Sequence, residues 1–170
     1  MKNRLTIALL GLAFLMAAIP AFGAAEEGAE ALIGRVRAVL QADHPQREDF
    51  TKALVAALDA SLLILPETDY AEEFRARIGT VREMFKDETL FSDKGRQYLG
   101  FAYRMVSGGQ PWRVPEELKT LEPNKGIEKS KEICARLIDE ALAEWKAGRN
   151  EQAVSRLIDF VLLVVTPIEA

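Results

Sequence analysis

Apolar residues recur at three- and four-residue steps along almost the whole chain, and this spacing limits what the chain can fold into. The step places the apolar side chains on one face of an α-helix, and that face has to be buried against another helix. A half-buried strand would need alternating apolar and polar residues between turn residues, and we find no such run. The sequence therefore predicts an all-α protein.

The helical spacing occupies six segments, most of them bounded by Pro, Gly or a capping residue. We expect helices at about 26–41, 46–65, 70–85, 93–107, 126–147 and 153–165, with Thr68 or Asp69 capping the third and Asn150 the sixth. Three prolines between the fourth and fifth segments argue against a continuous helix there. The prediction is an antiparallel bundle of five to six helices with short hairpin turns and one Pro-rich linker.

Two of these segments are unusually apolar, and two others match each other. The fourth is apolar on most sides, which is typical of a helix at the centre of a bundle. The end of the sixth, 160–165, is continuously apolar and has to pack in the core or against a partner. Residues 53–65 also match residues 153–165 at an offset of 100. This match predicts either two duplicated hairpins flanking a central helix pair or a coincidence between two leucine-rich helices.

The start of the chain has the pattern of a secretory signal peptide. Two basic residues precede an apolar run at 5–19, which Pro20 ends, and small residues follow at positions 21 and 23. We expect cleavage after Gly23, which would leave one all-α domain at 24–170 with no stable membrane anchor. The alternative is an uncleaved membrane anchor. The expected location is the periplasm or the cell exterior.

Charge and residue counts exclude several classes of function. The chain has a formal net charge of −4, and loss of Lys2 and Arg4 would leave 20 basic against 26 acidic residues, a charge of −6. An acidic protein of this kind is not expected to bind nucleic acid. One His and one Cys exclude a His/Cys zinc site and a disulfide within the chain, and a Ser-His mechanism would depend on His44. We therefore expect no metal, no cofactor and no enzymatic activity.

The segment 94–115 is the most unusual part of the chain, because it contains no Asp or Glu and carries a net charge of +4. Arg96, Gly100 and Arg104 follow one another at four-residue steps and share a helix face. The missing side chain of the glycine leaves a gap between two guanidinium groups, which suit a carboxylate or a phosphate.

Aromatic residues in the same segment add flat apolar surfaces on which a ligand ring stacks. The candidate ligand-binding residues are Arg96, Tyr98, Gly100, Tyr103, Arg104, Trp112 and Arg113. The alternative is that the arginines pair with acids of a neighbouring helix, such as Glu72, Glu73 or Glu83, and that the aromatic rings belong to the core.

Three further residues allow two interpretations each. Cys134 shares a face with Ile138 and is either a small buried hydrophobic residue or available for a disulfide with another chain. Asp59 and Asp159 interrupt apolar runs and are either buried partners of an arginine or exposed at a helix edge.

Two functions are consistent with this pattern. The first is an exported, non-catalytic helical protein that binds a protein partner or self-associates through its apolar helix faces. It predicts an exposed apolar patch of several hundred Å². The second is a bundle that binds a small anionic or aromatic ligand at 94–115. It predicts a pocket beside Gly100 that is lined by Tyr98 or Tyr103.

Overall fold

The protein, seen in a computed structural model that describes residues 21–85, 89–119 and 126–167, is built from helices joined by loops. No strand occurs within these ranges, so the all-α prediction is confirmed. Most of the predicted signal peptide lies outside the described residues. The helices are α2 (Ala21–Gln41), α3 (Arg47–Ile64), α4 (Ala71–Met84), α5 (Asp93–Val106), α6 (Glu116–Lys119), α7 (Gly126–Lys146) and α8 (Asn150–Val165), with a 3-10 turn η1 (Thr89–Phe91) before α5.

The six predicted segments correspond to α2, α3, α4, α5, α7 and α8, and α6 is the short turn or helix that the sequence indicates at 116–121 within the Pro-rich linker. Two predicted caps are wrong. α4 begins after Tyr70, and no side chain caps it. Thr68 contributes only its backbone carbonyl, which accepts the N–H of Ala71. α8 begins after Arg149, so Asn150 is its first helical residue.

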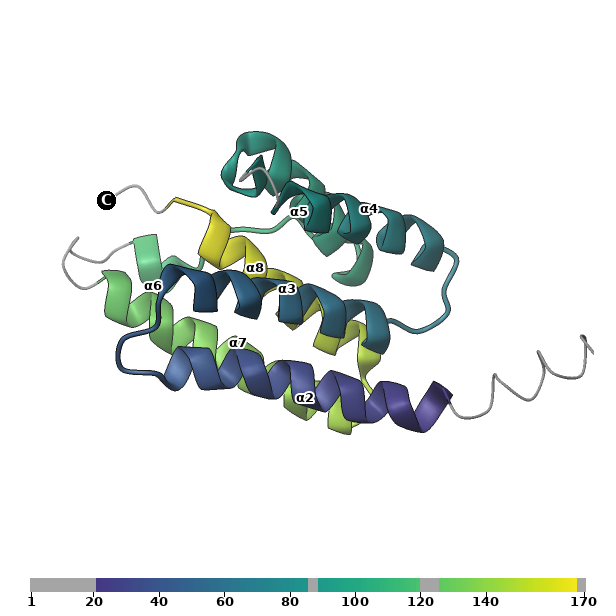
Figure 1. The fold of residues 1–170 in the computed structure, drawn as a ribbon. Helices are drawn as coiled ribbons and strands as arrows, with labels where there is room; N and C mark the ends of the chain where they lie inside the picture. The colour runs from purple at the N-terminus through teal and green to yellow at the C-terminus, as the bar shows by residue number, and fades with distance from the viewer. Residues whose placement is uncertain (1–20, 86–88, 120–125, 168–170) are drawn as a thin grey trace, which may run out of the picture.

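The helices lie in three pairs (Figure 1). α2 and α7 lie on one side, α3 and α8 run through the middle, and α4 and α5 cover the other side. α2–α3 and α7–α8 are hairpins, and their equivalent helices pack directly on one another, α2 on α7 and α3 on α8. The expectation that two hairpins flank a central pair is therefore wrong, because α4 and α5 lie beside the hairpins and not between them.

The last helix occupies the centre of the bundle. α8 packs against α3, α5 and α7, and more than half of its residues are buried, including Leu157, Ile158 and Phe160. Its apolar end is thus covered within the chain. α5, expected at the centre, is peripheral and buries only Gly95, Leu99, Ala102 and Val106. Its other apolar side chains are partly exposed, because only one face of α5 reaches α8 and α4.

A side-chain hydrogen bond joins the start of α4 to α8, and a local cap begins α5. The Tyr70 hydroxyl at the start of α4 donates a 2.5 Å hydrogen bond to Glu151 of α8. Burial, reinforced by this bond, raises the pKa of Tyr70 to about 12, so the hydroxyl remains a donor. Ser92 caps α5 by accepting the Gly95 N–H at 3.3 Å.

None of the helices in the described ranges has the length and apolar character needed to cross a membrane.

Candidate ligand-binding groove on α5

A hollow of about 310 Å³ lies over Gly100, between α5, the following linker and the end of α8. We call it the α5 groove. A Cβ atom placed on Gly100 would meet nothing within 4 Å, so the missing side chain leaves open space as the sequence predicts. The groove is lined by Arg96, Gln97, Gly100, Phe101, Arg104, Pro111, Trp112, Leu162 and Thr166.

The chain reverses after α5 and returns over the groove. Gly108 and Gly109 have φ values of +66° and +85°, a left-handed conformation that glycine adopts at little cost. The linker that follows reaches α8, where the indole Nε1 of Trp112 donates a 2.6 Å hydrogen bond to the Asp159 carboxylate. Trp112 therefore forms a wall of the groove that α5 alone would not provide.

The two arginines of the α5 groove differ in how much of their hydrogen-bonding capacity is used. Arg96 forms an ion pair with Asp93 of its own helix and donates a 2.6 Å hydrogen bond to the Phe91 carbonyl. Within the described part of the chain, Arg104 has no acidic partner, and its guanidinium lies 6.0 Å from the ring centre of Phe101. Arg104 is thus the cation of the groove that is available to an anion.

Two arginines lie near the ring of Phe101, a residue that is 49% exposed. The guanidinium of Arg77 from α4 lies 5.2 Å from the ring centre, and that of Arg104 lies 6.0 Å from it. Guanidinium groups at these distances interact favourably with an aromatic ring. Arg77 also pairs with Glu73, one of the acids that the alternative interpretation assigned to the arginines of α5.

The far wall of the α5 groove comes from the end of α8. Leu162 supplies an apolar surface beside Trp112. Thr166 supplies a hydroxyl group, and its Oγ1 atom is buried with no hydrogen-bond partner among the described residues. A buried hydroxyl without a partner loses free energy relative to its hydrated state, and Thr166 therefore contributes to the wall of the groove by its shape rather than as an accessible polar group.

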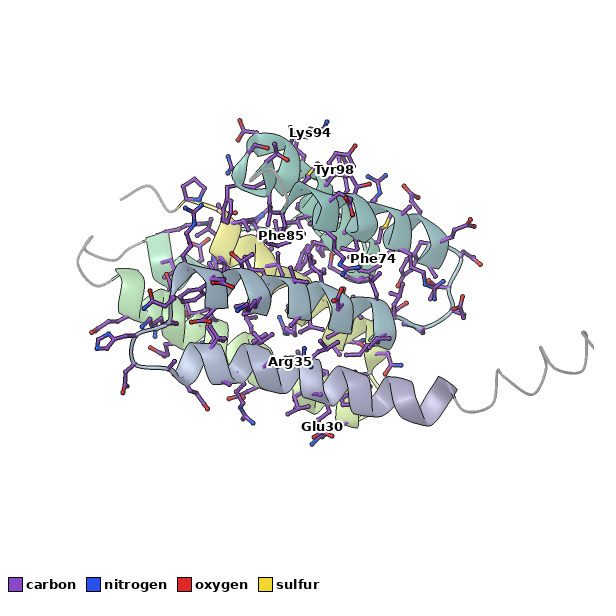
Figure 2. The ribbon with its side chains drawn as sticks, in the orientation of Figure 1. Glu30, Arg35, Phe74, Phe85, Lys94 and Tyr98 are labelled. Carbon is purple, nitrogen blue, oxygen red and sulfur yellow. The ribbon has the colours of Figure 1, made fainter. Side chains whose placement is uncertain are left out.

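The structure brings four of the seven predicted residues together in the groove: Arg96, Gly100, Arg104 and Trp112. Tyr98 lies ~200° around the helix from Arg96, since each residue turns the helix by ~100°. It is half-buried against the core, on the side of the molecule opposite Glu30 and Arg35 (Figure 2).

The other two predicted residues also lie outside the lining of the groove. Tyr103 lies near Ser155 and Asp159 of α8, and burial raises its pKa. Arg113 is exposed, because it follows Trp112 in an extended linker, where neighbouring side chains point to opposite sides. The pocket expected beside Gly100 is present, but Phe101 and Trp112 line it in place of the two tyrosines.

Sequence reasoning missed five of the lining residues. Gln97 and Phe101 lie one position after Arg96 and Gly100, so a wider helix face would have included them. Pro111 adjoins Trp112. Leu162 and Thr166 come from a helix more than fifty residues away, and no local pattern connects them to α5.

The structure shows the surroundings of Cys134, Asp59 and Asp159, for which the sequence allowed two interpretations each. Cys134 is buried, and burial together with the charge of Asp159 raises the pKa of its thiol to about 12. Asp59 pairs with Arg82 at 2.9 Å. Asp159 has a side chain that is only 15% exposed, and it lies 3.9 Å from Arg156.

Other hollows occur in the described part of the chain. One, of about 540 Å³, lies between α2 and α3 and is lined by Arg35, by Lys52, which pairs with Glu48, and by Asp59, which pairs with Arg82. Another, of about 390 Å³, lies over α7 and is lined by three acids and two arginines that pair with one another. The α5 groove differs from both in combining a cation that has no acidic partner among the described residues with two aromatic rings.

Fold and groove together define an all-α bundle with a small amphipathic groove on its outer helix pair. Comparison with known proteins adds no relative, because no family model, no curated protein and no solved structure matches the chain.

Proposed function

We propose that the chain is an exported, non-catalytic binding protein whose α5 groove takes a small anion with a flat apolar part. The observation that carries this proposal is the gap over Gly100, which is lined by both Arg104 and Trp112. Export rests on the signal-peptide pattern at the start of the sequence.

The chemistry of the groove favours a ligand with one negative charge. Arg96 is already held by Asp93 and by the Phe91 carbonyl, so Arg104 is left to pair with the anion. Apart from Gln97 and Thr166, the remaining side chains of the lining are aromatic or aliphatic, which suits a planar ring more than a compact, strongly hydrated anion such as phosphate.

Binding of defined probes tests the proposal by thermal shift and calorimetry. Naphthalene-2-sulfonate and 2-naphthoate combine a ring with one negative charge, whereas 2-naphthol lacks the charge and inorganic phosphate lacks the ring. We expect the two naphthalene anions to raise the melting temperature and the other two probes to have little effect. A ligand at a hundred times its Kd adds about 2.7 kcal/mol to the free energy of unfolding.

A matched pair of variants separates the groove from the general charge of the segment. Arg104→Gln and Arg113→Gln each remove one positive charge from 94–115, but only Arg104 lines the groove. We expect Arg104→Gln to weaken binding of naphthalene-2-sulfonate about tenfold, because one charge-assisted contact is lost. Arg113→Gln should bind as the wild type does. Equal losses in both variants, or no binding by the wild type, would overturn the proposal.

A protein partner is the second candidate, favoured by the exposure of Phe101 beside Arg77 and Arg104. Aromatic and arginine side chains are enriched among residues that dominate the energy of protein interfaces. The most exposed large apolar side chains of the described chain, Leu63, Phe91 and Phe101, lie on three different elements. Sedimentation equilibrium of the wild type and of Phe101→Ala tests self-association, and a wild-type monomer at all concentrations would contradict it.

A further inference from the structure

Trp112 is held by packing against the core and by one side-chain hydrogen bond to α8. Its linker, residues 107–115, forms no helix, and the ring is only partly buried. The bond from Nε1 to Oδ1 of Asp159 is 2.6 Å long and joins the linker to the central helix α8. Hydrogen bonds to an ionised acceptor are shorter and stronger than those to a neutral one. The charge of Asp159 therefore bears directly on where the indole lies.

Asp159 connects two hollows. Trp112 lines the α5 groove, whereas Asp159 itself lines the hollow over α7. That second hollow is open to solvent and brings charged residues close to the carboxylate. A change in the charge of Asp159 on one side is thus transmitted to the groove wall on the other.

The groups that face Asp159 come from four helices and the linker. They are Arg156 of α8, Cys134, Arg136 and Glu140 of α7, Tyr103 of α5 and Trp112 of the linker, with Glu117 of α6 lining the same hollow. Arg156 lies 3.9 Å from Asp159 but binds Glu140 more closely, at 2.9 Å. Arg136 is held by Glu117 at 3.1 Å. Each arginine therefore has a closer acidic partner than Asp159.

The balance of these influences favours protonation. Burial raises the pKa of Asp159 above the usual range of an aspartate, while the Trp112 hydrogen bond and Arg156 oppose this effect and Glu140 reinforces it. Asp159 therefore takes up a proton more readily than a fully solvated aspartate does.

We propose that Asp159 is a positioning residue for the α5 groove, and that its carboxylate holds Trp112 as the groove wall and releases it when mild acid removes the charge. Binding of an amphipathic anion is then strong at neutral pH and weak in mild acid. This inference rests on the proposed ligand-binding function, because the wall matters only if the groove has an occupant.

The first experiment follows Trp112 without any ligand. The chain contains two tryptophans, so Trp145→Phe leaves Trp112 as the one indole. We expect its fluorescence emission to change in a single step between pH 7.5 and pH 4.5 while circular dichroism shows an unchanged fold. Asp159→Asn in the same background keeps the shape and an acceptor oxygen but loses the charge, and it should abolish the step.

Asp59→Asn is the matched control. Asp59 occupies the equivalent position of α3, is also partly buried and pairs with Arg82. It forms no hydrogen bond with Trp112 among those described and does not line the α5 groove. We expect the step in Trp112 emission to remain in this variant. A step that persists in Asp159→Asn, or that disappears in both variants, would overturn the inference.

The second experiment measures binding of naphthalene-2-sulfonate, whose sulfonate stays ionised throughout this pH range. We expect its affinity for the wild type to fall about tenfold from pH 7.5 to pH 4.5, and its affinity for Asp159→Asn to be low and independent of pH. Binding that is equally pH-independent in both proteins would overturn the inference and leave the proposed function standing. No binding at pH 7.5, with the Trp112 step present and abolished by Asp159→Asn, would overturn the proposed function while supporting the control of Trp112 by Asp159.

Discussion

Gly95 of α5 lies so close to Leu90 of η1 that a Cβ atom on the glycine would stand 2.2 Å from the Leu90 carbonyl oxygen. This close approach fixes the start of α5 against η1. Five residues further along, Gly100 has open space where its side chain would be. The same residue type therefore has opposite roles within one helix, since the first glycine permits packing and the second leaves the gap of the α5 groove.

We expect alanine at these two positions to change stability in opposite directions. Gly95→Ala forces a backbone contact apart and should lower the free energy of unfolding by about 1–3 kcal/mol. Gly100→Ala meets no atom and restricts the unfolded chain, so it should raise stability by about 0.5–1 kcal/mol. Urea denaturation of both variants measures this difference. Two equal changes would show that the close contact with Leu90 does not constrain α5.

Two phenylalanines test which helix forms the core. Phe160 of α8 is completely buried, whereas Phe101 of α5 is 49% exposed. Phe160→Ala should lower the free energy of unfolding by about 3–5 kcal/mol, because it leaves a cavity in the centre of the bundle. Phe101→Ala should cost less than about 1 kcal/mol. Similar losses from denaturation curves would contradict the central position of α8.

Protonation of Asp159 should contribute to the pH dependence of the free energy of unfolding. Because burial raises its pKa in the folded state, the folded protein binds this proton more tightly than the unfolded chain does. The contribution of Asp159 to stability therefore rises as the pH falls through that pKa, and the cost of the buried charge is complete above it. Each pKa unit between the two states corresponds to ~1.4 kcal/mol.

We expect the stability of the wild type relative to Asp159→Asn to increase as the pH is lowered from 7.5 to 4.5. Arginine partners lower the pKa of Glu67 and of Glu117, which makes the protein less stable in acid, but both proteins share these groups and their effects cancel. Urea denaturation at a series of pH values gives the difference. A difference that is constant or that decreases in acid would contradict the burial of a charged Asp159.

The thiol of Cys134 should be unreactive in the folded protein. Its pKa of about 12 leaves almost no thiolate at pH 8, and the side chain is buried. We expect iodoacetamide to label the native wild type at least ~100-fold more slowly than the Ala143→Cys variant, whose new thiol lies at an exposed position of α7. Rapid labelling of native Cys134, or a dimer that reducing agent dissociates, would favour the disulfide between chains.

Much of the local structure follows from the sequence because helix formation is governed by short-range spacing. The apolar positions of 153–165 and the Gly108–Gly109 stop predict α8 and the end of α5 closely. The same spacing does not show which helix lies at the centre of the bundle. α5 looks apolar on most sides, yet it is peripheral, because burial depends on which helices surround a face and not on the face itself.

The groove was predictable to the extent that one helix builds it. Arg96, Gly100 and Arg104 share a face by periodicity alone, and the gap over Gly100 is present. The pairing of Arg96 with Asp93 is a contact between residues three apart on one helix, so helical spacing also indicates it. The distant groups around these side chains were not predictable, because Trp112 and Leu162 reach the groove only when the linker and α8 pack against α5.

The sequence by itself determined the helices, their approximate ends and the charge of the segment at 94–115, since each of these depends on residues within a few turns of one another. The tertiary structure alone decided that Trp112 meets Asp159, that Leu162 and Thr166 close the groove, and that α8 lies at the centre. Those contacts join residues far apart in the chain, and they depend on how whole helix faces pack, which no local pattern encodes.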